Sequence, residues 1–325
     1  MSLRKEIDSA IRNVLDSGMF IGGEFVSTFE AEFAAYCGVD HCVGVGNGTD
    51  AIFIALKALG VGPGDEVITA ANTFTATAEA IIATGAKVVF VDCKDDYTID
   101  ADKIDITPRT KAIVPVHMYG QPCDMDRIMD FGVYVVEDCS HAHGATIDGQ
   151  KVGSFGDIGA FSFYPTKLLG AYGQAGGIVT NNQAYAGMCR MLGNHGGINK
   201  YEHFFPAYNS GLDAIQAAIL SVKLKRLDYW NAVAVARAIY YNSQLDGLYV
   251  LPEITEGRVF HQYVIRTPDR DELVEKFGLL VHYPTALPYL GIPEYRSDRY
   301  LPKANLFQDQ IVSIPLFLET GLCGQ

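Results

Sequence analysis

The chain has 325 residues, of which 49% are hydrophobic and 19% are charged. This composition is typical of a globular protein with a large core, and the length predicts two domains or one large α/β domain with a smaller partner. The net charge of −13 argues against a nucleic acid as partner. No apolar run is long enough to span a bilayer, so we expect no membrane association.

Seven cysteines are scattered along the chain, and none forms a CxxC pair. This usage is typical of reduced thiols in a cytoplasmic protein. Residues 1–5 lead into an amphipathic helix rather than a signal peptide, which also predicts a cytoplasmic location. We expect no metal site, because the His141 and His143 pair has no third ligand at a diagnostic spacing.

Helices and strands alternate along most of the chain. A first helix places Ile7, Ile11 and Val14 on one face and ends at Gly18. A capping box at 27–30 predicts the start of a second helix, which ends at Tyr36. Short apolar runs then predict buried strands at 41–45, 66–69, 87–91, 112–116, 133–136, 159–163 and 177–179. Helical stretches at 51–59, 75–83 and 184–192 alternate with them. This alternation predicts a mostly parallel sheet with helices on both faces.

The pattern changes in the last third of the chain. Residues 213–245 contain no proline and predict one long or kinked helix, with a domain junction near Tyr229. Strands at 260–266, 280–283 and 311–314 and a helix at 272–276 follow, as expected for a small α+β domain. We therefore expect a large domain over residues 1–229 and a small C-terminal domain over residues 230–325.

One stretch near the middle of the chain, 161–170, carries a candidate nucleophile. An apolar strand stops before Pro165, and Lys167 follows two residues later at the start of a glycine-rich segment. An amine in such a confined, dry place is shifted toward its neutral and nucleophilic form. The alternative is an ordinary lysine in a surface loop.

Candidate ligand-binding residues follow other predicted strands, as expected where ligands bind at the carboxyl ends of strands in an open α/β sheet. Gly48 and Thr49 stand between the first strand and a helix, where free N–H groups and the helix dipole favour a phosphate. The alternatives are a plain strand-to-helix turn and a dinucleotide fingerprint, whose third glycine is misplaced here.

The second and fifth strands add an aromatic residue and a carboxylate. Phe74 stands at a strand–helix boundary, where it could form a flat wall for a planar ligand or simply belong to the core. Alternation sends Glu137 and Asp138 to opposite faces, so one of these two acids can point into a site. A phosphate site, a flat aromatic, a buried acid and a loop lysine together predict a pyridoxal phosphate site.

These motifs, in this order, resemble the sugar aminotransferases of the DegT/DnrJ/EryC1/StrS family. The similarity runs through nearly the whole chain, including the segments at 15–23, 48–51, 137–145, 161–170, 209–218 and 282–284. The resemblance implies a three-layer α/β/α large domain with a mostly parallel sheet, like that of aspartate aminotransferase and of fold type I, plus the small α+β domain. It also implies that the cofactor is pyridoxal 5'-phosphate.

The family's site residues carry over position by position. Lys167 resembles the lysine that bonds to the cofactor and moves protons, and Asp138 the acid that pairs with the pyridine nitrogen. Phe74 matches the aromatic stacked on the ring, and His141 a residue near the ring oxygen. Gly48, Thr49 and Ser162 match phosphate-binding positions. Asn209 matches an asparagine that reaches the phosphate of a neighbouring subunit, which implies a homodimer with shared active sites.

The sequence departs from the family pattern at three places near these motifs. Leu168 follows the lysine where asparagine is common, and Gln174 replaces an acid. Gly211 replaces the arginine of the common Asn-Ser-Arg-Leu-Asp. The departures leave the lysine and its acid intact, but they put subunit contacts and substrate fit in doubt.

The resemblance implies transfer of an amino group from an amino acid donor, by family habit glutamate or glutamine, to a nucleotide-linked keto-sugar. The loop around Tyr164 resembles the family members that aminate C3 of a 3-keto-6-deoxyhexose. The alternatives are amination at C4 and a regulatory protein that binds the cofactor without turnover. A dehydratase of the same family would carry histidine in place of Lys167.

Overall fold

The computed structural model describes residues 3–316, and Cys323 lies outside this range. A seven-stranded sheet forms the centre of the molecule, in the order β1-β9-β8-β5-β4-β2-β3. Its strands are β1 (His41–Val45), β2 (Glu66–Ala70), β3 (Lys87–Val91), β4 (Thr110–Val114), β5 (Tyr134–Asp138), β8 (Ile158–Ser162) and β9 (Gly176–Thr180). Six of these strands run in one direction, and β9 runs antiparallel to them. All seven predicted strands are present, several with slightly shifted ends.

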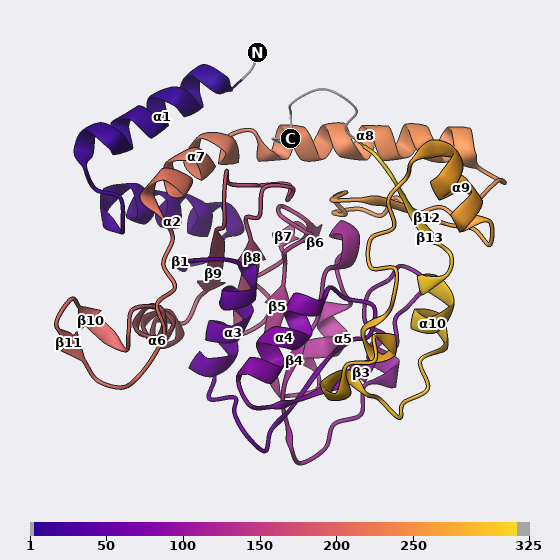
Figure 1. Cartoon of the computed structure of the whole chain (residues 1–325), viewed down its shortest axis with the longest axis horizontal. Helices are drawn as coiled ribbons and strands as arrows, with labels where there is room; N and C mark the ends of the chain where they lie inside the picture. Colours follow the sequence, from indigo (N-terminus) through magenta and orange to yellow (C-terminus); the bar gives the residue numbers. More distant parts are fainter. Residues whose placement is uncertain (1–2, 317–325) are drawn as a thin grey trace.

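Helices cover both faces of this sheet, as Figure 1 shows. One face packs against α3 (Gly48–Ala58), α4 (Thr75–Ala83) and α6 (Gln183–Gly193). The other face packs against α2 (Gly23–Cys37), α5 (Met125–Met129) and α7 (Ala214–Leu224). Alternation along β5 explains the two cores, since Val136 faces the first and Val135 the second. The predicted three-layer α/β/α architecture is confirmed.

A smaller hydrophobic core lies between α8 (Leu227–Leu245) and an antiparallel strand pair. The strands are β12 (Tyr263–Arg266) and β13 (Ile311–Ile314), with α9 (Arg270–Phe277) beside them. The chain then returns to the large sheet, because Ala304 and Phe307 of α10 (Pro302–Gln308) pack into its first core.

Residues 213–245 are helical with an interruption at 225–226 that separates α7 from α8, which agrees with the kinked alternative. Two local predictions are wrong. Residues 280–283 form no strand apart from a bridge at Leu280, since Tyr283 adopts φ 65° and ends any extended run. The expected capping box is absent as well. The helix α2 already begins at Gly23, so Ser27 lies in its interior and donates a hydrogen bond to the Glu24 carbonyl.

The remaining elements are short, apart from α1 (Arg4–Ser17), which ends at Gly18 as predicted. They are β6 (Thr146–Ile147), β7 (Gln150–Lys151), β10 (Gly197–Asn199), β11 (Glu202–His203), and the 3₁₀ turns η1 (Ala101–Lys103), η2 (Met118–Gly120), η3 (Leu287–Tyr289) and η4 (Pro293–Tyr295). The hairpin of β10 and β11 projects from the body in Figure 1. No helix within residues 3–316 has the length and hydropathy needed to cross a bilayer.

Candidate active site

A cavity of about 820 Å³ opens at the carboxyl ends of several sheet strands. One wall consists of residues that follow β1, β2, β4, β5 and β8. The opposite wall comes from irregular segments that flank β12 and α9. The lining residues are Asn47, Gly48, Thr49, Asp50, Ile52, Thr73, Phe74, Ala76, Thr77, Val116, Asp138, Ser140, His141, Ser162, Tyr164, Thr166, Lys167, Gln174, His261, Gln262, His282 and Tyr283.

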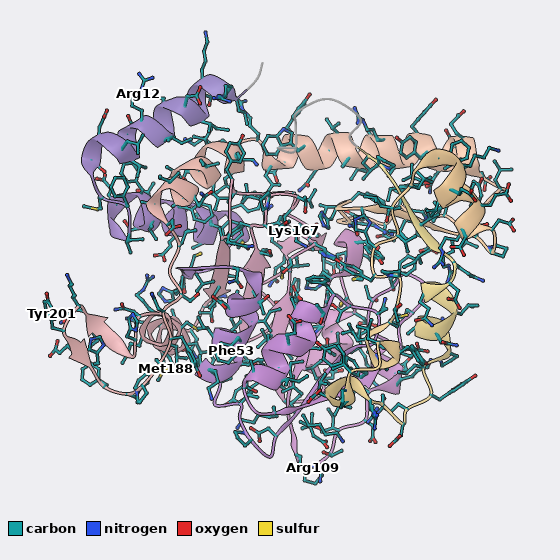
Figure 2. The ribbon with its side chains drawn as sticks, in the orientation of Figure 1. Arg12, Phe53, Arg109, Lys167, Met188 and Tyr201 are labelled. Atoms are coloured by element: carbon teal, nitrogen blue, oxygen red, sulfur yellow. The ribbon has the colours of Figure 1, made fainter. Side chains whose placement is uncertain are left out.

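Lys167 lies on the loop after β8, and Figure 2 labels it below α8 near the middle of the molecule. A tight turn places it, with its N–H donating to the Tyr164 carbonyl at 2.8 Å. The next residue, Leu168, is buried in the second core and anchors the loop there. Burial lowers the pKa of Lys167 to about 8, although the nearby Asp138 charge acts in the opposite direction. The amine is therefore much closer to its neutral form at physiological pH than an exposed lysine.

Asp138 lies at the end of β5, and only 4% of it is exposed. Its carboxylate accepts hydrogen bonds from Thr77 Oγ1 at 3.0 Å and from the Ser140 N–H at 3.1 Å. Thr77 belongs to α4 and is itself bonded to Thr73 Oγ1 at 3.0 Å, so a chain of two hydroxyls links the acid to the segment after β2. A buried carboxylate with these partners can pair with a cation in the cavity.

Glu137, the neighbour of Asp138, points to the other face of the sheet, as alternation predicts. It accepts hydrogen bonds from the N–H groups of Gly153, Phe155 and Gly156, each at 2.8 Å. His117 Nε2 lies 3.0 Å from the same carboxylate, and its Nδ1 accepts from the Cys123 N–H. Since these partners already occupy both groups, we interpret the buried cluster as structural.

The N-terminus of α3 faces the cavity. Asn47 caps the helix by accepting from the Asp50 N–H at 2.8 Å, and Gly48 and Thr49 form its first turn. The first N–H groups of a helix have no partner within the helix, so they can bind an anion. Gly48 lies against Ser162, since a Cβ at position 48 would come within 2.5 Å of Ser162 Cβ. Glycine thus brings Ser162 close to the helix end.

Three aromatic rings join the two walls of the cavity. The rings of His141, Tyr119 and Tyr283 are nearly parallel to one another, with 5.9 to 6.1 Å between each pair of ring centroids. The Nδ1 of His141 accepts from the Tyr119 N–H at 3.4 Å, so the proton of the neutral ring lies on Nε2. That Nε2 donates to the Tyr283 hydroxyl at 3.0 Å. Burial, with the nearby Lys167 charge, holds the pKa of His141 well below its usual value, which keeps the ring neutral.

Phe74 lies at the cavity mouth with 49% of it exposed, which is unusual for a large aromatic. Its ring centroid is 5.5 Å from that of Tyr283. The expected flat wall is therefore available, and Phe74 is not a core residue.

The cavity brings together Gly48, Thr49, Phe74, Asp138, His141, Ser162 and Lys167. It does not include Asn209, which is exposed and pairs with Asn194 at the base of the projecting hairpin. Of the three departures from the family pattern, Gln174 lines the cavity, Leu168 is buried, and Gly211 is exposed with open space around it.

Several lining residues are not predicted by the sequence patterns. Thr77 follows Phe74 by three residues, and the pattern there indicates only the aromatic. His282 and Tyr283 belong to a motif that contributes to the family resemblance, but the motif by itself indicates no role for them. His261 carries no local signal, since it is a single histidine before a strand. These residues reach the cavity through long-range packing.

The residues present fit pyridoxal phosphate. Unpaired helix N–H groups face one part of the cavity, an exposed aromatic face lies at its mouth, and a buried acid and an amine of lowered pKa line the same space.

The sequence profile of the DegT/DnrJ/EryC1/StrS aminotransferase family matches residues 1–322. The chain belongs to this family. A similar relative is the dTDP-3-amino-3,4,6-trideoxy-alpha-D-glucose transaminase of Streptomyces venezuelae, which is 43% identical over 97% of this chain and 88% of the relative. A second is a pleiotropic regulatory protein of Geobacillus stearothermophilus, 44% identical over 98% of this chain and 91% of the relative.

The fold is also similar to the crystal structure of S. venezuelae DesV in complex with a ketimine intermediate. The TM-score is 0.93 at 42% identity, with 99% of this chain and 92% of that chain covered. The family resemblance, the fold class and the aminotransferase class are thereby confirmed. Aminotransferases of this family depend on pyridoxal phosphate, which confirms the predicted cofactor.

Proposed function

We propose that this aminotransferase transfers an amino group from glutamate to C3 of a nucleotide-linked 3-keto-6-deoxyhexose. One observation carries the proposal: a lysine of lowered pKa and a buried carboxylate share a cavity with a free helix N-terminus. The name of the S. venezuelae relative supports the choice of a 3-amino sugar.

Pyridoxal phosphate, when bound, accepts the electron pair that is released when a bond at the substrate carbon breaks. We assign its phosphate to Gly48, Thr49 and Ser162, because the helix N–H groups and the serine hydroxyl meet at one point. We assign its ring to the face of Phe74. His141 would lie near the ring oxygen, and Tyr283 holds the imidazole in place through the hydrogen bond to Nε2.

Lys167 has two roles in this proposal. Its neutral amine, available because of the lowered pKa, would hold the cofactor in the resting enzyme. When it is free, the amine would accept a proton from the substrate carbon and return it. An amine whose pKa is about 8 can both accept and release that proton near neutral pH.

Asp138 keeps the pyridine nitrogen protonated in this proposal. The carboxylate is buried and held by Thr77 and Ser140, so it offers a fixed negative charge in a place with little water. Such a charge favours the protonated form of a ring nitrogen beside it.

We also propose a homodimer with shared active sites. The hairpin of β10 and β11 carries exposed apolar residues, among them Ile198 with 69% and Tyr201 with 83% exposed. Figure 2 labels Tyr201 far from Lys167 of the same chain. Lys167 is the one lysine or arginine among the described cavity residues, so further cations for an anionic substrate come from elsewhere. A second copy whose Asn209 reaches the phosphate would complete the site.

The division into a large domain over residues 1–229 and a small domain over residues 230–325 remains a proposal. The separate core beneath α8 supports it, while the return of α10 to the large sheet ties the two parts together. We propose a cytoplasmic location as well, because six described cysteines are buried free thiols.

Tyr164 supports the choice of C3. It lines the cavity three residues before Lys167 and is 46% exposed, so its ring can form a wall for the sugar. A displacement of about 1 Å at the reacting carbon can cost about a hundredfold in rate, so one wall residue can decide the position of amination.

The test is a screen of nucleotide-linked 3-keto and 4-keto sugars with glutamate as donor. We expect turnover with a 3-keto-6-deoxy sugar and an amine at C3 by proton NMR. An amine at C4 would contradict the C3 assignment and support the alternative, amination at C4. The Geobacillus relative is named as a regulatory protein, so a protein without turnover is the second alternative. Failure to release 2-oxoglutarate from glutamate would favour it.

A further inference from the structure

His261 lies in the cavity wall that faces Lys167, and the assignments above give it no role. Two backbone hydrogen bonds fix the segment that carries it. The Val259 N–H donates to the Gly120 carbonyl at 3.1 Å, and the Gly257 carbonyl accepts from the Thr146 N–H at 2.9 Å. The approach at Gly120 is so close that a Cβ there would lie 2.1 Å from the Val259 carbonyl oxygen. The fold therefore positions His261 over the site without help from a ligand.

Three cavity histidines differ in how their ring nitrogens are used. His141 bonds through both, to the Tyr119 N–H and the Tyr283 hydroxyl. His282 bonds through Nδ1 to Ser313 Oγ at 2.7 Å. For His261 no hydrogen bond to another of the residues at 3–316 is found, and its ring packs against His141 at 4.7 Å between centroids. His261 is partly exposed to the cavity, and its ring nitrogens make no hydrogen bond to these residues, so the imidazole can bond a bound molecule.

The charge state of His261 restricts what that molecule can be. Burial first, and then the charge of Lys167, hold its pKa well below the usual value. A neutral imidazole has one N–H donor and one lone pair. A hydroxyl group offers the matching acceptor and donor, whereas a carboxylate or phosphate is better bound by a cation.

We propose that His261 is a specificity-determining residue that hydrogen-bonds a sugar hydroxyl on the carbon next to the reacting carbonyl. This inference rests on the proposed function, because only the sugar acceptor carries such a hydroxyl and glutamate does not. His261 therefore acts in the half-reaction with the sugar far more than in the half-reaction with the donor.

The experiment compares wild type, His261→Phe and His261→Asn with three ligands. These are the nucleotide-linked 3-keto-6-deoxy sugar, its analogue without the neighbouring hydroxyl, and glutamate. Phenylalanine fills the space without a polar atom, while asparagine restores a donor and an acceptor. We expect His261→Phe to raise KM for the hydroxylated sugar by about tenfold to a hundredfold, with partial rescue in His261→Asn. Calorimetric binding of the aminated sugar product should show the same order.

The analogue and the donor decide between recognition and packing. With the analogue that lacks the neighbouring hydroxyl, the wild type should lose its advantage over His261→Phe. The rate of the glutamate half-reaction, followed by cofactor absorbance, should differ between wild type and His261→Phe by less than about threefold. Equal losses with both sugars, equal losses in both half-reactions, or no loss at all would each overturn the inference. A wild type that accepts none of the keto-sugars would instead overturn the proposed function, and this is visible without any variant.

Discussion

The two walls of the cavity are built in different ways. Lys167, Asp138 and the Gly48 turn follow sheet strands directly, so the sheet fixes their positions within a few residues of chain. His261 and Tyr283 lie on irregular segments, which backbone contacts at Gly120 and side-chain contacts at His141 hold against the sheet. In the proposed function, the strand-end wall carries the groups that make and break bonds, and the irregular wall recognises and positions the substrate. Substitutions on the two walls should therefore have different signatures.

The largest effect is expected from Lys167→Ala on the strand-end wall. Without the amine the cofactor has no covalent partner and the proton has no carrier, so activity should fall at least about a thousandfold. Borohydride treatment of wild type should fix the cofactor on a single peptide that contains Lys167. The matched control is Lys87→Ala, an exposed lysine of β3, which should keep full activity. Label on another lysine would contradict the assignment.

Asp138 and Glu137 provide the second test, because they are adjacent acids on opposite faces of one strand. Asp138→Asn should keep the cofactor but lose about a hundredfold to a thousandfold in kcat, since an amide cannot hold the ring nitrogen protonated. Glu137→Gln replaces an acceptor of three backbone N–H groups and should lower the free energy of unfolding by about 2 kcal/mol. Its kcat per folded, cofactor-loaded molecule should stay near wild type.

Steady-state kinetics and urea unfolding of both variants separate these outcomes. If Glu137→Gln lost as much kcat as Asp138→Asn, the two faces would not be functionally distinct.

The contrast between the two walls also explains which site residues and which local structures can be predicted from the sequence. Strand runs and the residues that follow them are local patterns, so they indicate Lys167, Gly48 and the adjacent acids Glu137 and Asp138 as candidates. The choice of Asp138 over Glu137 comes from the family resemblance. The left-handed turn at Tyr283 is not predictable in this way, because φ 65° at a tyrosine depends on the hydrogen bond to His141 and on packing. The predicted strand at 280–283 is wrong for this reason. The position of the interruption at 225–226 is not predictable either, since every residue there is compatible with a helix.

Tyr283→Phe tests the irregular wall at a smaller scale. It removes the hydroxyl that accepts from His141 Nε2 at 3.0 Å but keeps the ring beside Phe74. We expect activity to fall by about tenfold, the usual range for one lost hydrogen bond at a buried group. Tyr295→Phe is the matched control, because that hydroxyl bonds Thr75 Oγ1 at 2.7 Å and neither residue is among the described cavity residues. Equal losses in the two variants would remove the positioning role from Tyr283.

The smallest effect concerns His143, which is fully buried behind the strand-end wall with its ring near those of Phe161 and Phe163. Burial, with the Lys167 charge, lowers its pKa to about 3. Unfolding restores the ordinary value of about 6.5, so between these values the unfolded state binds more protons. The stability that comes from the neutral ring is therefore complete above about pH 6.5 and declines as the pH falls toward about 3.

His143→Leu removes this titration. Between pH 7 and pH 5.5 the variant should lose about 1 kcal/mol less unfolding free energy than wild type, whatever its stability at pH 7. Phe161→Leu disturbs the same packing without removing a titrating group, so it should keep the wild-type pH dependence. Urea unfolding at the two pH values measures all three proteins. If His143→Leu kept the full acid sensitivity, other histidines whose pKa values are also lowered, such as His141 and His261, would account for it. In that case the charge state of His143, behind the strand-end wall, would contribute little to the stability of the fold. Lys167 and Asp138, which face the cavity, would be the charged groups of this wall that matter.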